Sequence, residues 1–597
     1  MVQRTFDILE HISRSYGANH NVLAAKNEGI WVHTNISQYI ENSKAISCGL
    51  LEMGLTKGDK IAVISNNRPE WNFLDMGMSA IGVVHVPIYT TISSDDFTYI
   101  LHHAEPKLVF VSDKVIYEKI KNITDKLDVV KGVYSFNRIK GVKHWQEIVE
   151  LGKETADKHH DTLMSIKVCV MPQDLSTLIY TSGTTGTPKG VMLSHSNLVS
   201  NFLQQVNNHS LSQGCRTLSF LPLSHIYERS MNYHFQFKGL CIYYAENMGT
   251  IMDNIKEVKP HIFTSVPRLL ERVYGGIIGK GKDLPFIKKN IFFWAVNLGN
   301  NFKRNNENGW FYNLQLKLAN KLVFKKWRAA LGGSLKIVVS GGAALQPRIS
   351  RIFGAAGIDI LEGYGLTETS PVIAVSNHVT NEILYGTVGS VLPGVQLKFA
   401  EDGEILCKGP NVMMGYYKEP DLTREVIDSE GWFHTGDIGV LVENKYLKIT
   451  DRKKEMFKLS SGKYVAPQVI ENKLKESFFI EQVMVVGENE KFASAVISPN
   501  FTFLHNWCSI HRIQFQDNKD LIQIPEVIER FQKEVTFINK SLGLTEQIKR
   551  FRLVSEEWTQ QTGELSPTLK LKRKYIADKY RDVIEDIFKK NGDDSAE

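Results

Sequence analysis

A short loop rich in glycine and hydroxyl side chains constrains this chain more than any other stretch. Residues 180–190 read YTSGTTGTPKG, with three glycines, five serine or threonine hydroxyls and one lysine, Lys189. The apolar segment 175–180 before it is typical of a buried strand. Glycines allow backbone N–H groups to approach phosphate oxygens closely, and a lysine adds positive charge. The stretch therefore predicts a strand followed by a phosphate-binding loop, although the same residue types also form ordinary surface turns.

The spacing excludes the common P-loop, G-x-x-x-x-G-K-[ST], because Pro188 stands where its second glycine would be.

At 597 residues the chain is too long for one hydrophobic core, so two or more domains are expected. The hydrophobic fraction of 43% and charged fraction of 23% are ordinary for a soluble globular protein. The net charge of +6 does not indicate a nucleic-acid partner.

The sequence also bears on the compartment. The six cysteines form no C-x-x-C pair, which leaves no visible zinc or redox motif. The N-terminal segment lacks the apolar core of a signal peptide, and no run of about 18 apolar residues predicts a membrane span. We therefore expect a reduced, cytoplasmic protein, with peripheral contact at the cytoplasmic face of a membrane as an additional hypothesis.

Apolar strands alternate with helical patterns in the first part of the chain. Strands are predicted at 61–65, 83–88 and 108–111, and a helix at 35–51, which favours a doubly wound, largely parallel sheet. Short glycine-punctuated segments between 386 and 441 suggest a small β-barrel or an antiparallel sheet. We predict an α/β protein, with parallel-rich sheets flanked by helices and a small β-barrel in a large N-terminal domain. The predicted boundaries are 1–451 for this domain, 452–456 for a hinge and 457–597 for a small mobile C-terminal α/β domain.

Further motifs carry groups that suit a nucleotide. DILEGYGLTETSP, at 359–371, is predicted to form a loop after a short strand, and it offers an aromatic ring, Tyr364, for a flat base. Thr367 and Glu368 in this motif offer the oxygen ligands that Mg²⁺ prefers. HTGD ends on Asp437, and a carboxylate can accept both ribose hydroxyls. DRKKE at 451–455 would by composition be a solvated turn, and Lys453 keeps that interpretation.

YTSGTTGTPKG and GYGLTET resemble motifs of the adenylate-forming superfamily, which includes acyl-CoA synthetases, luciferases and peptide-synthetase adenylation domains. The run from 431 to 454 is similar to the signature segment of fatty acyl-CoA synthetases, and the resemblance extends from about residue 35 to 576. It implies that ATP activates a long-chain fatty acid. The carboxylate attacks the α-phosphate, pyrophosphate leaves with Mg²⁺, and the thiol of CoA then displaces AMP. In the family the C-terminal domain rotates about the hinge between the two steps.

The resemblance also assigns roles to residues. It implies catalytic roles for Lys570, Glu368, Thr367, His225 and Lys189, and Mg²⁺ coordination by Thr181 and Glu368. The ATP-binding residues that it implies are Thr181, Ser182, Gly183, Thr184, Thr185, Gly186, Lys189, Gly342, Ala343, Gly363, Tyr364, Gly365, Thr367, Asp437 and Arg452. It places the hinge at Lys454, the CoA and thioester face at Lys458, Ser461 and Gly462, and an acyl gate at Val266, Pro267 and Arg268.

Two of these assignments depart from the simplest pattern. The family's mobile lysine usually follows a glycine, whereas Lys570 follows Leu569, and Lys572 and Lys574 stand close by. The alternative is a basic surface tail. His225 matches a position that holds an aromatic residue or histidine beside the acyl carboxylate, but an isolated histidine is more often a packed or surface residue.

Residues 279–330 form an unusual segment with eleven lysines and arginines, two acids and ten aromatic residues. Basic residues interleaved with phenylalanine and tryptophan are typical of an interfacial helix. The alternative is a basic helical insertion whose aromatic side chains pack in the core. Nucleic-acid binding is the weaker hypothesis for this segment, because it contains no recognised nucleic-acid-binding fold.

The expected partners are therefore a long-chain fatty acid, ATP and CoA. One alternative is a fatty acyl-AMP ligase that loads a carrier protein, and a peptide-synthetase adenylation domain is less favoured because no carrier module is attached. Another is a lipid-binding or membrane-associated relative without catalysis. The latter would be expected to have lost some of the residues that the chain retains, namely Lys189, Glu368, Asp437, Arg452 and Lys570. A monomer and a homodimer both stay open.

Overall fold

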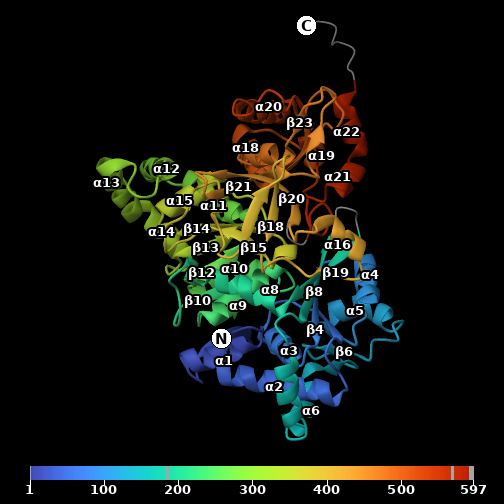
Figure 1. Ribbon diagram of the computed structural model, residues 1–597. Helices are drawn as coiled ribbons and strands as arrows, with labels where there is room; N and C mark the ends of the chain where they lie inside the picture. The colour runs from blue at the N-terminus through green and yellow to red at the C-terminus, as the bar shows by residue number, and fades with distance from the viewer. Residues whose placement is uncertain (1, 183–186, 567–569, 590–597) are drawn as a thin grey trace.

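The computed structural model describes residues 2–182, 187–566 and 570–589 (Figure 1). Two large sheets and their helices form the N-terminal part, and a smaller α/β unit lies over one end of the strands (Figure 1). Among the described residues, no helix is both long and apolar enough to cross a membrane. The loop residues Gly183–Gly186, which carry part of the expected phosphate site, lie outside the described ranges.

An eight-stranded sheet carries the hairpin that leads into and out of the glycine-rich loop. Its strands run in the order β19 (Gly415–Tyr416), β9 (Pro188–Ser194), β8 (Leu175–Ser182), β4 (Val84–Ile88), β3 (Lys60–Ile64), β5 (Leu108–Val111), β6 (Gly132–Ser135) and β7 (Lys143–His144). From β8 to β7 neighbouring strands are parallel, whereas β8 and β9 are antiparallel. The strands expected at 61–65, 83–88, 108–111 and 175–180 are confirmed to within two residues at their ends.

A thirteen-stranded sheet changes from parallel to antiparallel at β14. Its order is β17 (Gln396–Phe399), β18 (Glu404–Lys408), β20 (Phe433–Val442), β21 (Tyr446–Arg452), β16 (Ser390–Val391), β15 (Val372–Val375), β14 (Asp359–Gly365), β13 (Ile337–Ser340), β12 (Ile262–Ser265), β10 (Arg216–Ser219), β11 (Cys241–Tyr244), β1 (Asn21–Asn27) and β2 (Ile30–Asn35). The segments between 386 and 441 are antiparallel as expected. Strands β16, β17, β18 and β20 extend this sheet, whereas β19 pairs with β9 in the eight-stranded sheet.

Helices cover both sheets. In the N-terminal part they are α1 (Asp7–Tyr16), α2 (Ile36–Glu52), α3 (Pro69–Ala80), α4 (Ser94–Ala104), α5 (Lys114–Thr124), α6 (Trp145–Glu154), α7 (His160–Cys169), α8 (His195–Gln204), α9 (Ile226–Phe237), α10 (Ile251–Val258), α11 (Pro267–Lys282), α12 (Phe286–Asn300), α13 (Gly309–Ala319), α14 (Lys325–Ala330), α15 (Pro347–Ala355) and α16 (Pro420–Val426). Asn35 caps α2, which confirms the helix expected at 35–51, and Ser194 caps α8.

The C-terminal part has its own hydrophobic core. Strands β24 (Ile480–Val486), β25 (Ser494–Pro499) and β26 (Arg550–Leu553) form a sheet, and β22 (Phe457–Lys458) pairs with β23 (Tyr464–Val465). The helices are α17 (Pro467–Leu474), α18 (Phe501–His511), α19 (Asn518–Leu521), α20 (Pro525–Asn539), α21 (Arg573–Lys579) and α22 (Arg581–Phe588). The buried apolar residues of this part form two clusters that contain no buried residue before Leu459. This supports the predicted division near 452–456, which remains our proposal.

The two parts meet at α11 and α15. Arg268 forms an ion pair with Glu481, and Arg348 donates a hydrogen bond to the Glu476 carbonyl oxygen at 2.8 Å. The ammonium of Lys282 lies 4.2 Å from the centre of the Phe503 ring. These contacts hold the C-terminal part against the N-terminal part beside the ends of β12 and β13.

Candidate functional site

The phosphate hairpin places Lys189 beside an acidic residue from a distant segment. In the β8–β9 register Thr181 faces Lys189, so both residues stand at the mouth of the loop. The Lys189 ammonium lies 5.3 Å from the centre of the Tyr416 ring. Burial, and then the neighbouring Lys454, lowers the pKa of Lys189, while Glu368 acts in the opposite direction. The lysine is thus already partly desolvated and surrounded by charge of both signs.

Glu368 is held in place by the same tyrosine. It lies in a 3₁₀ turn, Thr367–Thr369, directly after β14, and its Oε1 accepts a hydrogen bond from the Tyr416 hydroxyl at 2.9 Å. Among the described residues no group of three or more histidine, cysteine or acidic side chains could hold a metal alone. The oxygen set of Glu368, Thr367 and Thr181 nevertheless fits Mg²⁺, because this ion commonly binds one or two carboxylates together with substrate phosphates and waters.

The residues expected around the nucleoside come together. Tyr364 donates a hydrogen bond to Asp437 Oδ2 at 2.8 Å, and the Arg452 Nε lies 2.9 Å from Asp437 Oδ1. Asp437 and Arg452 are also direct partners in the β20–β21 ladder. A carboxylate fixed between a phenol and a guanidinium can reorient little, and its predicted role at the ribose hydroxyls stays a prediction. Gly365 accepts no side chain, since a Cβ there would lie 1.8 Å from the Pro371 carbonyl oxygen.

The turn after β13 carries two more of the residues that are expected at the nucleoside. Gly342 has a φ of +84°, a left-handed conformation that favours glycine, and neither Gly342 nor Ala343 is covered by other residues. The motif GYG, expected in a loop, instead forms the end of β14. The reason is pairing: Gly363 and Tyr364 face Val375 and Ala374 of β15.

Lys570 from the C-terminal part enters the same site. Its backbone is fixed by two hydrogen bonds to Ser566, at 2.8 and 3.1 Å. Burial and then Arg452 lower the pKa of Lys570 to about 8, whereas Asp437, Glu455 and Glu368 raise it. The amine therefore lies within electrostatic reach of both the ribose clamp and Glu368. Lys572 and Lys574 are exposed, whereas Lys570, the lysine that the resemblance assigns, is half-buried.

His225 lies next to Lys570 at the start of α9. Its Nδ1 accepts the backbone N–H of Tyr227 at 3.1 Å, which fixes the ring. Burial, and to a smaller extent Lys570, lowers the pKa of His225 to about 4. With that pKa the imidazole is neutral at physiological pH, and the catalytic role of His225 stays a prediction.

Other predicted residues lie apart from this cluster. Val266 caps α11, Pro267 begins it, and Arg268 contacts Glu481 and, at 3.4 Å, Glu271. Lys458, Ser461 and Gly462 lie on the exposed β22–β23 hairpin. No hydrogen bond, ion pair or ring contact joins that hairpin to Lys570, Glu368 or Asp437 within the described part of the chain. Their gate and CoA roles stay predictions.

Sequence reasoning missed Tyr416 and Arg573. The GYY string that contains Tyr416 has no chemical signature by itself, and only the pairing of β19 with β9 brings it to Lys189. Arg573 appeared to belong to a basic tail, but its guanidinium contacts Glu455 at 2.8 Å and Glu471 at 2.7 Å. It thereby ties the segment that carries Lys570 to the hinge turn.

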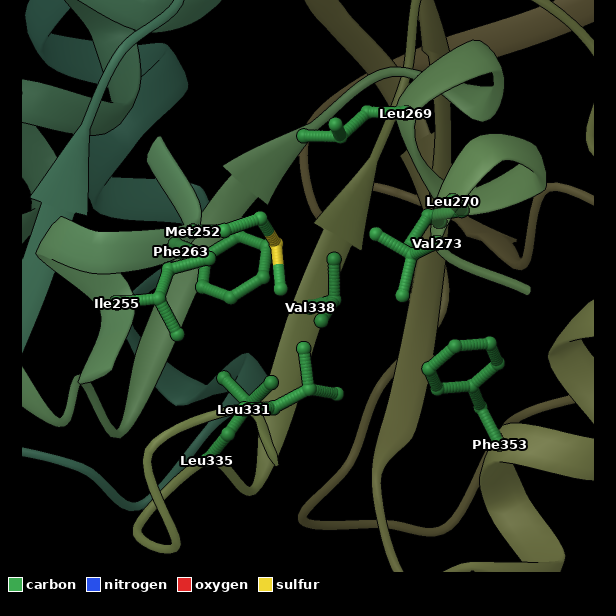
Figure 2. A pocket seen from close by; sticks show the side chains of 10 residues that line it. All are labelled: Met252, Ile255, Phe263, Leu269, Leu270, Val273, Leu331, Leu335, Val338 and Phe353. Atoms are coloured by element: carbon green, nitrogen blue, oxygen red, sulfur yellow. The ribbon is translucent and has the colours of Figure 1, made fainter. Parts of the chain in front are cut away.

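An apolar cavity lies between α11 and the sheet (Figure 2). Side chains from α10, α11, α15, β12 and β13 converge on it, and all of its lining is hydrophobic. The lining residues are Met252, Ile255, Phe263, Leu269, Leu270, Val273, Leu331, Leu335, Val338 and Phe353. Leu269, the first residue of α11 that lines it, directly follows Arg268 of the predicted gate.

Comparisons with known proteins agree with this geometry. The AMP-binding enzyme family model matches residues 13–417, and the model of the AMP-binding enzyme C-terminal domain matches 454–592. The chain is 32% identical to long-chain-fatty-acid–CoA ligase FadD15 of Mycobacterium tuberculosis, over 94% of this chain and 93% of the relative. It is also 32% identical to long-chain-fatty-acid–CoA ligase 1 of Homo sapiens, over 92% of this chain and 82% of the relative.

Solved structures share the fold at lower identity. The adenylation domain of a carboxylate reductase from Mycobacterium chelonae superposes with a TM-score of 0.73 at 21% identity, over 98% of this chain and 91% of that one. An anthranilate CoA ligase in complex with anthranoyl-AMP gives a TM-score of 0.70 at 17% identity, over 96% and 97%. The family matches cover most of the chain, and the fold agrees with them. This chain therefore belongs to the AMP-binding enzyme family of adenylate-forming, acyl-activating proteins.

Proposed function

We propose that the protein activates long-chain fatty acids with ATP, through an acyl-adenylate, and transfers the acyl group to CoA with release of AMP and pyrophosphate. The observation that carries this proposal is that Lys570, from the C-terminal part, lies within electrostatic reach of Glu368 and of the Asp437–Arg452 pair. A fatty acyl substrate is supported by the relatives, which are named as long-chain-fatty-acid–CoA ligases.

In the first half-reaction a carboxylate oxygen of the acid attacks the α-phosphorus of ATP, and the bond to pyrophosphate breaks. Asp437 and Arg452 hold the ribose, and Tyr364 flanks the adenine. Lys570 and Thr367 offset charge at the α-phosphate, while Lys189 holds the departing phosphates. Positioning and electrostatic stabilisation supply most of the rate enhancement in phosphoryl transfer. Glu368, with Thr181, would hold Mg²⁺, which neutralises phosphate charge when bound.

In the second half-reaction the thiol of CoA attacks the acyl carbon, and AMP leaves with the electron pair. We propose that the C-terminal domain rotates about Lys454, which withdraws Lys570 and brings the Ser461–Gly462 turn to the cleft. This turn is exposed, so it is available for such a contact. The rotation must break the Arg268–Glu481 ion pair and the Lys282–Phe503 contact, because both join α11 to the moving part.

The acyl tail would extend along the apolar cavity beside α11 (Figure 2). Each buried methylene contributes roughly 0.8 kcal/mol, so a sixteen-carbon tail offers up to about 11 kcal/mol over acetate. The cavity has a volume of about 10 Å³, roughly the space of one water molecule, so the proposal requires α11 to move outward when the tail enters. A wholly hydrophobic lining favours an alkyl chain over an amino acid or another polar acid.

The test is release of AMP and pyrophosphate from ATP with acids of two to twenty carbons, with and without CoA. We expect steady turnover only with CoA, increasing with chain length into the long-chain range. Turnover that needs a carrier protein instead of CoA would identify an acyl-AMP ligase. Absence of pyrophosphate release with every acid would refute the proposal in favour of a non-catalytic relative.

A further inference from the structure

One helical surface of the protein exposes large apolar side chains. Along α13 and the π-helical turn Asn320–Phe324 that continues it, Trp310, Phe311, Leu314, Leu318 and Leu322 are 79%, 61%, 58%, 51% and 40% exposed. Steps of three or four residues place side chains on the same side of a helix. These five residues therefore form one continuous apolar strip, which we call the α13 strip.

The opposite side of the same helices is buried in the core. Ala319, Val323, Phe324 and Trp327 are almost fully buried, and Phe292 of α12 packs against Trp327. The aromatic residues of segment 279–330 thus include a buried group that fixes the helices to the protein, a half-buried group, and an exposed group that consists of Phe286, Trp310 and Phe311. Core packing accounts for the buried group and leaves the exposed group unexplained.

Lysines follow the same helical spacing as the strip. Lys317, Lys321 and Lys325 are all exposed and alternate with Leu314, Leu318 and Leu322. The whole segment contains eleven basic and only two acidic residues. Long lysine side chains can lay their methylene groups along an apolar face while the ammonium reaches outward. An apolar strip flanked by lysines is complementary to a surface with a hydrophobic interior and negatively charged groups on its outside.

We propose that the α13 strip docks the protein on the surface of an anionic lipid bilayer, with Trp310 and its apolar neighbours in the acyl boundary and the lysines at the lipid phosphates. The helices α12 and α13 project together from one side of the molecule, away from the C-terminal part (Figure 1). The C-terminal part therefore does not stand between these helices and a membrane that they approach. This proposal does not depend on the ligase activity, because it concerns binding to lipid alone.

The charge pattern disfavours the other occupants of such a surface. A second copy of the chain docked through a two-fold axis would bring like charges together, since the same patch meets itself. Nucleic acid would suit the lysines, but the aliphatic side chains Leu314, Leu318 and Leu322 offer no stacking surface for bases. A bilayer satisfies both components at once.

The experiment is flotation of the full-length protein with two kinds of vesicle. One kind is phosphatidylcholine alone, and the other contains about 30% of the anionic lipid phosphatidylglycerol. Two variants change the surface: Lys317→Gln/Lys321→Gln/Lys325→Gln and Trp310→Ser/Leu314→Ser. Matched controls are Lys114→Gln/Lys126→Gln/Lys140→Gln, on exposed lysines elsewhere, and Phe537→Ser, whose side chain is 73% exposed on α20. The lysine variant removes charge and the Trp310 and Leu314 variant removes apolar surface, so the two contributions are tested separately. The controls make the same kinds of change outside the strip.

We expect binding to anionic vesicles that weakens at high salt. A lysine near such a surface is worth about 1 kcal/mol, or roughly fivefold in affinity, so the triple lysine variant should bind at least about tenfold more weakly. The Trp310 and Leu314 variant should lose a similar factor, and both controls should bind as the unmodified protein does. Equal binding by the strip variants and the controls would overturn the proposal. So would a strip-dependent change from dimer to monomer in solution without lipid, which would assign the surface to a second copy.

Discussion

The pH dependence of adenylate formation follows from the environment of Lys570. Its pKa is lowered to about 8 by burial and by Arg452, although Asp437, Glu455 and Glu368 counteract this effect. With that pKa, about 90% of the amine is protonated at pH 7 and about 10% at pH 9. If the charged form is required at the α-phosphate, kcat/KM for ATP falls about tenfold over this range.

The assay is ATP–pyrophosphate exchange with a long-chain acid and no CoA, measured from pH 6 to pH 9.5. The quantity of interest is kcat/KM for ATP, because it reports pKa values of the enzyme before ATP binds. Omitting CoA removes the titration of its thiol. Lys570→Arg is the matched variant, since a guanidinium stays charged throughout and should abolish the decrease above pH 8.

A second readout separates the two half-reactions. Lys570→Ala should lose adenylate formation across the whole range yet still convert supplied acyl-AMP and CoA to the thioester. An alkaline decrease that persists unchanged in Lys570→Arg would assign the titration to another group and refute the reasoning. Equal loss of both half-reactions in Lys570→Ala would refute the role of the lysine itself.

Three further substitutions test the site and the core. Tyr416→Phe keeps the ring beside Lys189 but removes the hydrogen bond to Glu368. Adenylation should therefore fall roughly tenfold and require more Mg²⁺. Metal titration of the ATP complex checks the Mg²⁺ requirement. Lys189→Met should slow adenylation roughly a hundredfold but spare thioester formation from acyl-AMP; equal losses would contradict a phosphate role. Burial raises the pKa of Glu228 to about 7, so the folded protein retains a proton that the unfolded chain releases, and stability falls as pH rises from about 4.5 through 7. Glu228→Gln should remove up to about 3 kcal/mol of that penalty, so its thermal midpoint should exceed that of the unmodified protein at pH 8 but not at pH 5.

Local sequence patterns predicted the scaffold well. The strand at 108–111 and the helix capped by Asn35 have the expected limits, because apolar periodicity and capping act over a few residues. The GYG motif was expected in a loop but lies on β14, since its conformation depends on pairing with β15. Likewise the antiparallel segments after 386 join the two large sheets, β19 the eight-stranded one and the others the thirteen-stranded one, because strand partners are chosen by contacts distant in sequence.

The sequence by itself identified the residues of the candidate site: the glycine-rich hairpin, Asp437 with Arg452, and the acidic residue at 368. It did so because each of these groups stands in a contiguous motif. Only the tertiary structure showed that Lys570 is the least exposed of the three nearby lysines, that Tyr416 hydrogen-bonds Glu368, and which aromatic residues of 279–330 remain exposed. Those outcomes depend on burial and on partners far apart in the chain, and neither is a property of a short stretch of residues.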